Sequence, residues 1–345
     1  MTQEFNTLAA EYLPAIEAEM RSVLRASDQT TGASDPFYGM IHYHMGWADT
    51  GFNPVTIKSG KRIRPLLCLL ACAAAGGDWR QALPAAAAIE IIHNFSLVHD
   101  DIQDNSPTRR GRATLWTIWG QPQAINTGDA MFAMAHLALG RLTDRGVPAG
   151  TVVHALRRFD EMCVDLTRGQ YTDMSFETRD SNVTVDEYLA MITGKTAVLL
   201  SLCAELGALV AGADETRAGH FAKFGRDLGL AFQIQDDILG IWGDEDITGK
   251  SAATDIVTRK KTLPILYGLA KSETLRELYD DDNGEGEFVH RVVKALDEIG
   301  ARQYAVDEAE RYSNGALTSL SAAQPGGPAA AALHQLTDIL LQRNF

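Results

Sequence analysis

Hydrophobic residues recur every three or four positions along most of this chain, which is the spacing of one face of an α-helix. The pattern first predicts a helix from Glu4 to Arg25, followed by a turn-rich segment. Two apolar helices are expected next, the first over residues 60–77 and the second from about 82 to 104. Further helices are predicted at 126–143, 151–176, 185–210 and 215–241, with more helix closing the chain around a break at 324–328.

No segment shows the period-two alternation of a half-buried strand, and no internal repeat or low-complexity linker divides the chain. The chain has 345 residues, of which 46% are hydrophobic, enough for a large core. We therefore expect an all-α fold, a helical bundle in a single domain over residues 1–345. Its candidate motifs are concentrated in a core of about 58–270.

Charge and cysteine usage narrow the possible partners and compartment. The formal net charge of −14 argues against nucleic acid, which needs clustered Lys and Arg. The four cysteines lie in apolar helical contexts without metal-ligand spacing, so buried thiols are expected. The amino terminus is amphipathic and acidic, and the longest apolar run is far shorter than a membrane span of about 20 residues. These features predict a soluble, cytoplasmic protein without a transmembrane segment.

An acidic group lies at the end of the helix that contains IEIIHNFSLVHDDIQD, residues 89–104. Asp100 and Asp104 project from one face one turn apart, and Asp101 lies on a neighbouring ridge. Carboxylates this close repel one another unless cations neutralise them, and hard oxygen ligands suit Mg²⁺ bridged to phosphates. The pattern indicates a magnesium-bound diphosphate, although a lone DDxxD is also typical of a solvated helix face.

A second acidic pair, Asp236 and Asp237, occurs in another apolar stretch, FQIQDDILG. More than a hundred residues separate it from the first group, so folding can bring the two together across a cavity. Two acidic walls facing one gap would form a site for several metal ions.

Basic residues flank these acidic stretches. Arginine offers a planar fork of donors that suits phosphate, and a helix start adds unpaired N–H groups. Candidate phosphate ligands are Lys61, Arg62 and Arg64 at a helix start, Arg109, Arg110 and Arg112 in a turn, Lys195 in an apolar helix, and Lys250, Lys260 and Lys261 in a later loop. A solvated basic turn is the alternative for the first cluster. His42 and His44 alternate with aromatic residues and are interpreted as surface or packing histidines, since no zinc-type spacing follows.

With these motifs in place, the sequence resembles the trans-isoprenyl diphosphate synthases, the family of farnesyl and geranylgeranyl diphosphate synthases. The resemblance runs from about Gly60 to Pro264 through GKRIRP, HNFSLVHDDIQD, RRG, GQYTD, GKTA, FQIQDD, GK and KKTLP, in the order of the family. It implies a helical bundle around a deep hydrophobic cavity with both aspartate motifs at the mouth. It also implies a homodimer and three Mg²⁺ ions per active site.

The resemblance also assigns site residues. The catalytic set that it implies is Asp100, Asp101, Asp104, Asp236, Asp237, Lys195, Thr196 and Gln233. Within this set the direct Mg²⁺ ligands are Asp100, Asp104 and Asp236. The allylic diphosphate is assigned to Arg109, Lys195, Lys250 and Lys260, and isopentenyl diphosphate to Lys61, Arg64, His93 and Arg110.

The implied reaction is a 1′-4 head-to-tail condensation of isopentenyl diphosphate with an allylic diphosphate. Cations help the allylic C–O bond to ionise, and the apolar cavity keeps the carbocation away from water. The released pyrophosphate takes the final proton in this family, so no side chain with a tuned pKa is needed as a general base.

The chain departs from the family pattern in two places. The second motif ends DDILG, with Gly240 where the family has an aspartate and Asp244 one turn beyond. This difference makes metal affinity the property in doubt, while activity is expected to survive. Trp116 stands where a histidine is more usual.

Product length is expected to depend on Phe95 and Ser96, one turn deeper than Asp100. One bulky and one small residue there resemble the C20 type, with C15 the next choice. Met131, Phe132 and Met134 can raise or lower the floor.

Two alternatives remain open from the sequence. A class I terpene cyclase has a similar cavity but would need neither a second diphosphate site nor FQIQDD. A non-catalytic subunit of a heteromeric synthase is favoured only by Gly240, since all three aspartates of the first motif are retained.

Overall fold

The computed structural model describes residues 3–25, 35–57, 60–178, 183–243, 254–280 and 285–341. The described chain is almost entirely helical, as predicted. The first half forms α1 (Gln3–Val23), α2 (Pro36–His44), α3 (Ile63–Ala74), η1 (Trp79–Ala82), α4 (Leu83–Gln103), β1 (Thr108–Arg109), β2 (Arg112–Ala113), α5 (Leu115–Trp119), α6 (Gln121–Gly140), η2 (Arg141–Arg145) and α7 (Ala149–Thr178). The second half forms α8 (Val185–Ile192), η3 (Thr193–Ala197), α9 (Val198–Val210), α10 (Glu215–Trp242), α12 (Thr254–Val257), α13 (Leu263–Lys271), α14 (Glu273–Asp280), α15 (Glu285–Glu298), α16 (Ala301–Ala322) and α17 (Gly327–Leu341).

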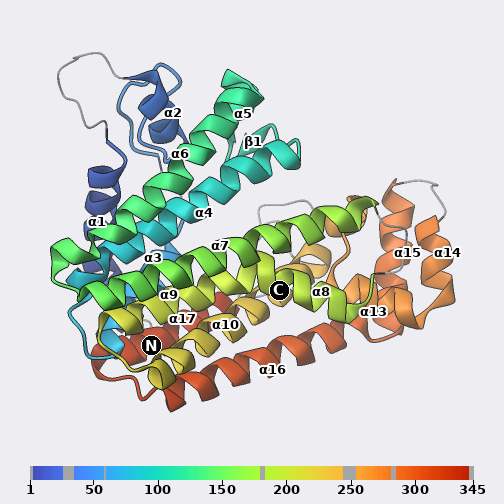
Figure 1. Ribbon diagram of the computed structural model, residues 1–345. Coiled ribbons are helices and arrows are strands. Elements are labelled where there is room, and N and C mark those ends of the chain that lie inside the picture. Colours follow the sequence, from blue (N-terminus) through green and yellow to red (C-terminus); the bar gives the residue numbers. More distant parts are fainter. Residues whose placement is uncertain are drawn as a thin grey trace.

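The long helices pack side by side as a bundle (Figure 1). α4 packs along α6 and α3, while α10 packs along α9 and α16. α7 contacts α9 and the short segment η3 that precedes it. The shorter helices α13, α14 and α15 gather at one end of the bundle, and α2, α5 and the small hairpin of β1 and β2 lie at another side (Figure 1).

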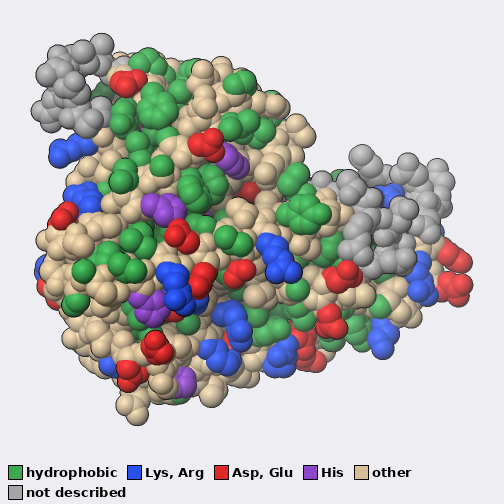
Figure 2. All heavy atoms as spheres, in the orientation of Figure 1, with side chains coloured by type: hydrophobic (Ala, Val, Ile, Leu, Met, Phe, Trp, Pro, Cys, Tyr) green, Lys and Arg blue, Asp and Glu red, His purple; other side chains and the backbone are tan. Residues whose placement is uncertain are grey.

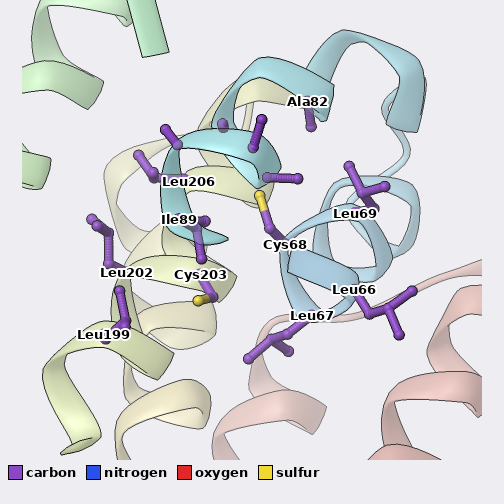
Figure 3. Packing of buried hydrophobic residues seen from close by; sticks show 14 of the residues in the cluster. Leu66, Leu67, Cys68, Leu69, Ala82, Ile89, Leu199, Leu202, Cys203 and Leu206 are labelled. Atoms are coloured by element: carbon purple, nitrogen blue, oxygen red, sulfur yellow. The ribbon is translucent and has the colours of Figure 1, made fainter. Parts of the chain in front are cut away.

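The centre of the core is the contact of α3 with α4 and α9, shown in Figure 3. Leu67 and Cys68 of α3 face this region, as do Ile89 of α4 and Cys203 of α9, and all four are fully buried. A Cβ at Gly207 would lie 2.2 Å from the carbonyl oxygen of Cys68, so only glycine lets α9 approach α3 this closely. All four cysteines are buried and unbridged, which confirms the expected thiols.

The predicted helices are confirmed, with shifts at some ends. The helix expected from residue 126 begins earlier, at Gln121, where Pro122 occupies the first turn. The helix expected over 185–210 contains one π-helical turn, η3, which the periodicity did not reveal. The hairpin β1 and β2 was not predicted either, because each strand has only two residues.

The stretch Val185–Val210 is long and apolar enough to cross a membrane by length and composition alone. In the fold, 61% of its apolar window is buried inside the protein. Its apolarity is therefore accounted for by its position in the core, against α3, α7 and α10.

Candidate active site

The first acidic motif lies at the carboxyl end of α4. Asp100 is in the last turn, and Asp104 is the residue that caps the helix. Burial raises the pKa of Asp100 to about 6, with a further increase from Asp104, while Lys195 opposes the shift. Asp100 and Asp104 therefore face a common region that also receives a lysine, as the spacing predicted.

Asp101 has different surroundings. Its side chain is only 3% exposed, and its Oδ1 accepts a 2.7 Å hydrogen bond from Nε of Arg109. Burial raises the pKa of Asp101, whereas Arg109 lowers it. Asp101 thus holds Arg109 in place. The three carboxylates that were expected to act together are divided, with Asp100 and Asp104 as one pair and Asp101 in an ion pair with Arg109.

The arginines of the RRG motif occupy the hairpin formed by β1 and β2. Arg109 pairs with Arg112 in the hairpin register, and Arg110 and Gly111 form the turn with φ of 52° and 75°. This left-handed conformation suits glycine at the second position. An ideal Cβ on Gly60 would lie 3.1 Å from Nη2 of Arg110, so the hairpin reaches the GKRIRP loop.

Arg112 does not join the phosphate-binding residues. Its two terminal nitrogens donate to the carbonyl oxygens of Tyr43 and Ala48, and its guanidinium lies 3.9 Å from the ring centre of Tyr43. The expectation that all three arginines contact phosphate is therefore wrong for Arg112, which binds α2 and the segment after it. Trp116 also supports this loop by donating from Nε1 to the carbonyl oxygen of Ser106 at 2.9 Å.

A cationic cavity of about 270 Å³ lies between the GKRIRP loop and α4. Lys61, Arg64, His93 and Arg110 all line it, as the resemblance implied. Nε of Arg64 is buried without a hydrogen-bond partner among the described residues, and burial lowers the pKa of this guanidinium. Burial and the neighbouring Arg64 also depress the pKa of His93, so its imidazole is neutral. Such a cavity is suited to an anion with several oxygens.

Arg62 also lines this cavity but is held by acidic residues. Its Nη1 lies 2.6 Å from Oε1 of Glu90, and its Nη2 lies 3.6 Å from Oε2 of Glu17. Its own backbone is left-handed, with φ of 51°. Arg62 therefore ties the loop to α4 and α1, and its expected contact with phosphate stays a prediction.

A second cavity of about 380 Å³ adjoins the first, since Arg64 and His93 line both. Asp100 and Lys195 lie at its polar part. Its lining also includes Phe95, Ser96, Leu97, His99, Gln103, Leu166, Thr167, Gln170, Tyr171, Met174, Thr196 and Leu199. The cavity therefore combines charged groups with a long apolar surface.

The turn η3 carries Lys195 and Thr196 into this cavity. α7 approaches it at Gly169, where an ideal Cβ would lie 2.2 Å from the backbone nitrogen of Lys195. Gly194 also lies close to α7, since its Cβ would lie 2.9 Å from the carbonyl oxygen of Asp165. The glycines of GQYTD and GKTA therefore let the two segments touch, and Nζ of Lys195 lies 2.5 Å from Asp173.

The second acidic motif lies near the end of α10. Asp237 is 1% exposed and accepts hydrogen bonds from the Tyr188 hydroxyl, the Leu263 backbone N–H at 3.1 Å and Nε2 of Gln233 at 3.3 Å. Burial raises the pKa of Asp237 to about 6, and Lys260 is the largest opposing influence. Asp237 thus joins α10 to α8 and α13, whereas Asp236 is partly exposed.

Thr196 and Gln233 form a connected polar pair. The Thr196 hydroxyl donates to Oε1 of Gln233 at 3.0 Å, which leaves the Gln233 amide nitrogen directed to Asp237. The amide is therefore held in one orientation.

Each of the two acidic walls has a lysine side chain close to its carboxylates. Lys195 lowers the pKa of Asp100 and pairs with Asp173. Asp237, Asp255, Asp173 and Asp236 together raise the pKa of Lys260 against the effect of burial. Lys260 therefore lies among the carboxylates of the second wall, whereas Lys261 donates to the carbonyl oxygen of Phe176. Lys250 and Asp244 lie outside the described residues.

The carboxylates of the two acidic motifs are the candidate ligands for Mg²⁺. Within the described ranges, no group of three or more His, Cys, Asp or Glu side chains is close enough to hold a metal ion unaided. Asp100 and Asp104 on one wall and Asp236 on the other still offer hard oxygen donors. Mg²⁺ commonly uses one or two carboxylates together with substrate phosphates and water, so these residues fit it.

Phe95 lines the second cavity and packs against α6. The ring of Phe95 lies 5.2 Å from that of Phe132 in an edge-to-face arrangement, and it is 9% exposed. Ser96 points its hydroxyl back to the carbonyl oxygen of His93 at 2.8 Å. The ring of Phe95 is therefore backed by the ring of Phe132.

Sequence reasoning missed the roles of two groups. Asp173 of GQYTD holds Lys195, and the motif itself was the available signal. His44 was interpreted as a packing histidine, but it lines a small cavity with Asp101, Arg109 and Arg110, and its Nε2 is buried without a partner in the described structure. Burial and the two arginines lower the pKa of His44 to about 3.

Comparison with known proteins agrees with this geometry. Residues 47–296 match the family model described as polyprenyl synthetase. The chain is 42% identical over 283 residues to a geranylgeranyl diphosphate synthase of Mycobacterium tuberculosis, with 79% of each chain covered. It is 41% identical over 281 residues to a (2E,6E)-farnesyl diphosphate synthase of Mycobacterium bovis, covering 79% of this chain and 77% of that one. Its structure resembles the crystal structure of a polyprenyl synthetase from Streptomyces coelicolor A3(2), with a TM-score of 0.84, 35% identity and coverage of 99% and 98% of the two chains.

Proposed function

Because the chain belongs to the polyprenyl synthetase family, we propose that it condenses isopentenyl diphosphate with an allylic diphosphate to give an all-trans C20 diphosphate. The observation that carries this proposal is the pair of adjoining cavities. One is cationic and the other has an acidic and basic mouth above an apolar interior, and they meet at Arg64 and His93. This arrangement suits two diphosphate substrates, of which only one carries a long prenyl chain.

We assign isopentenyl diphosphate to the cationic cavity. Lys61, Arg64 and Arg110 supply the positive charge, and the buried Nε of Arg64 needs an acceptor. Neutral His93 offers one donor and one acceptor without adding to the charge. Since His93 also lines the second cavity, it borders the place where the two substrates meet.

We assign the allylic diphosphate to the mouth of the second cavity. Asp101 holds Arg109 and Asp173 holds Lys195, so both cations are oriented before the substrate binds. Lys260 reaches the site from the opposite wall, and Lys250 completes the set assigned to this diphosphate. Asp100, Asp104 and Asp236 would hold Mg²⁺, as three ions per site, and these ions would supply positive charge to the leaving diphosphate.

The remaining residues protect and stabilise the carbocation. The apolar lining excludes water, which would otherwise capture the cation. The Thr196 hydroxyl and the fixed Gln233 amide present oxygen dipoles near the reacting centre. Asp237 acts by positioning Gln233, Tyr188 and the start of α13, which assigns it a supporting role in the catalytic set.

The ring of Phe95, which lines the second cavity and is backed by Phe132, supports a short product. The named relatives include a geranylgeranyl and a farnesyl diphosphate synthase, so C20 is proposed with C15 as the next possibility. Ser96 leaves more room beside Phe95 than a second aromatic ring would.

Product analysis tests the proposal. The purified protein is incubated with Mg²⁺, isopentenyl diphosphate and, in separate reactions, the C5, C10 and C15 allylic diphosphates. We expect a discrete C20 diphosphate. Products of C15 or longer than C20 would retain the chemistry and overturn the floor argument. A hydrocarbon formed from the allylic substrate alone would indicate a terpene cyclase, and no elongation with any starter would indicate a non-catalytic subunit.

We further propose that residues 1–345 form one domain, which acts as a cytoplasmic homodimer. The helices α6 and α7 expose large hydrophobic side chains, among them Leu137 and Val164, which are 69% and 66% exposed. Figure 2 shows hydrophobic side chains at the surface on the face where these helices lie in Figure 1. Burial of such a surface against a second copy would stabilise a dimer.

A further inference from the structure

A small cavity of about 40 Å³ lies between the end of α2 and the hairpin of β1 and β2. Its lining includes His44, Asp101, Arg109 and Arg110. Arg110 also lines the cationic cavity, so the two cavities adjoin at this residue. His44 belongs to none of the motifs of the site, yet it lies beside both arginines of the turn, which are assigned to the two different diphosphates.

The end of α2 is held against the hairpin, which fixes the position of His44. The Tyr43 hydroxyl donates to the carbonyl oxygen of Ala113 at 2.9 Å. Arg112 donates in the opposite direction, to the carbonyl oxygens of Tyr43 and Ala48. Because Tyr43 is buried and clamped from both sides, the next residue, His44, has a fixed backbone position relative to the turn of the hairpin.

The tautomer of His44 follows from hydrogen bonds on α4. The Asn94 amide nitrogen donates to the carbonyl oxygen of Glu90 at 2.8 Å and to Oε1 of the same residue at 3.0 Å. These oxygens are acceptors, so the Asn94 amide oxygen is left to accept in turn. Asn94 hydrogen-bonds to the His44 side chain, and Nε2 has no partner in the described structure, so Nδ1 donates to Asn94. A neutral imidazole has one donor and one acceptor, which makes Nε2 the acceptor.

A water molecule suits the small cavity better than an anion does. Nε2 of His44 is a buried acceptor, and leaving it without a donor is unfavourable. An anion would face both this lone pair and the carboxylate of Asp101, which would repel it. A water can donate to these two acceptors and accept from a guanidinium group, and it needs only about 10–15 Å³ and two to four polar partners.

We propose that the small cavity binds an ordered water, which donates to Nε2 of His44 and accepts from the guanidinium groups of Arg109 and Arg110. His44 is then a positioning residue for both arginines, and it orients them without adding to their charge. The inference rests on the proposed function, because the two arginines are assigned there to two different substrates. One imidazole would thus influence both diphosphate sites.

His44→Leu removes the acceptor and leaves a side chain that fills much of the same space. We expect the KM values of both substrates to rise by about three- to tenfold, the effect of one lost hydrogen bond. The value of kcat should change little, because His44 touches no reacting atom. His44→Gln retains an amide oxygen as acceptor and should keep both KM values close to those of the wild type.

His42→Leu is the matched control on the same helix. Nε2 of His42 lies 2.8 Å from the carbonyl oxygen of Leu24, so this imidazole connects α2 to the end of α1. His42 lines neither the two large cavities nor the small one. Its replacement should lower thermal stability without raising either KM.

Two further measurements do not depend on turnover. Isothermal titration calorimetry with inorganic pyrophosphate in the absence of Mg²⁺ reports on the cationic groups alone, and His44→Leu should bind it more weakly than the wild type or His42→Leu. A crystal structure of the wild type should show a water within hydrogen-bond distance of Nε2 of His44. The same water should be missing in His44→Leu.

The proposal is overturned if His44→Leu leaves both KM values unchanged, if only one of them rises, or if the wild-type crystal structure shows no water at Nε2. Should His44→Leu fail to fold, the wild-type crystal structure still decides. The elongation assay of the wild type separates this inference from the proposed function. If the wild type elongates a prenyl chain and His44→Leu binds pyrophosphate normally, only the role of His44 is wrong. If the wild type does not elongate but His44→Leu binds pyrophosphate more weakly, the proposed reaction is wrong and the role of His44 stands.

Discussion

Nε of Arg109 lies 2.7 Å from Oδ1 of Asp101, so the middle aspartate of the first motif orients an arginine of the following hairpin. Asp101 is almost fully buried by α4 and the hairpin, while Arg109 remains 30% exposed. This relationship distinguishes Asp101 from Asp100 and Asp104. It implies that Asp101 affects the binding of a substrate rather than the binding of metal directly.

We expect Asp101→Asn to raise the KM for the allylic diphosphate by about 10- to 100-fold. A hydrogen bond to a charged group is worth ~1.5–3 kcal/mol, and every 1.4 kcal/mol corresponds to a factor of about ten. The KM for isopentenyl diphosphate should change little, because that substrate is assigned to the cavity around Arg64. Steady-state kinetics with each substrate varied in turn measures both values.

Asp227→Asn is the matched control for this variant. Asp227 is equally buried and pairs with Lys223, yet it lies earlier on α10 and lines neither of the two large cavities. It should lower stability without a selective effect on one substrate. Equal increases in both KM values for Asp101→Asn would contradict the assigned role.

Phe95→Ala is expected to lengthen the product, because it removes a bulky ring from the lining of the second cavity. Phe132→Ala alone should leave the product unchanged, since Phe95 still separates that position from the cavity. The double variant should give the longest chains. Chromatography of the dephosphorylated products measures the distribution. A product that stays at C20 in the double variant would show that other residues set the length.

The sequence was sufficient to predict the helical bundle and the positions of both acidic motifs, because these depend on local spacing. The helix of Asp100 and Asp104 follows from period and apolar content alone. The pairing of individual charges could not be predicted in this way. Arg62 and Arg112 belong to the same basic motifs as Arg64 and Arg110, but the sequence does not show that Arg62 pairs with Glu90 or that Arg112 donates to the Tyr43 carbonyl.

Other residues have roles that depend on contacts between segments distant in the sequence, so the sequence alone does not reveal them. Gly169 and Gly194 are separated by a predicted loop, and only the packing of α7 on η3 shows that both must be glycine. Spacing identifies which residue types are present, but the tertiary contact decides what each one does.

We expect Gly169→Ala to impair turnover more strongly than folding. The added methyl group would lie 2.2 Å from the backbone nitrogen of Lys195, so η3 must shift and Lys195 with it. Overpacking of this kind costs ~1–3 kcal/mol of stability. A loss of kcat by about tenfold or more, with a cooperative thermal transition retained, is the expected result.

Gly150→Ala is the control on the same helix, because its Cβ would meet nothing within 4 Å. It should keep both kcat and thermal stability close to those of the wild type. If Gly169→Ala behaved in the same way, the close contact of α7 with η3 would not be what positions Lys195.

The pKa of His44 predicts part of the acid sensitivity of the fold. Its pKa is about 3 in the folded protein, below the ordinary value of 6.5, because burial and two arginines disfavour the imidazolium. The stability that it contributes is therefore present above pH 6.5 and is lost as the pH falls toward 3. The maximum slope from this one group is ~1.4 kcal/mol per pH unit.

His44→Gln removes this titration, so the free energy of unfolding should fall less steeply between pH 6.5 and pH 4.5 than it does in the wild type. Urea denaturation across this pH range measures the slope. His334→Gln, an exposed substitution on α17, is the control and should keep the wild-type slope. A His44→Gln slope equal to that of the wild type would mean that His44 can accept a proton in the folded state.

The exposed stripe on α7 predicts the effect of charge on assembly. Val153 and Val164 are spaced by eleven residues, which places them on one face of the helix, and they are 67% and 66% exposed. Leu137 lies on the neighbouring α6. If this face is the homodimer interface, Val164→Glu would place a carboxylate inside an apolar contact, and an unpaired buried charge strongly opposes association. Light scattering coupled to size-exclusion chromatography should therefore show a dimer for the wild type and a monomer for Val164→Glu. Val257→Glu on α12 replaces another exposed valine and should remain a dimer. A dimer that persists in Val164→Glu would move the interface to a different face.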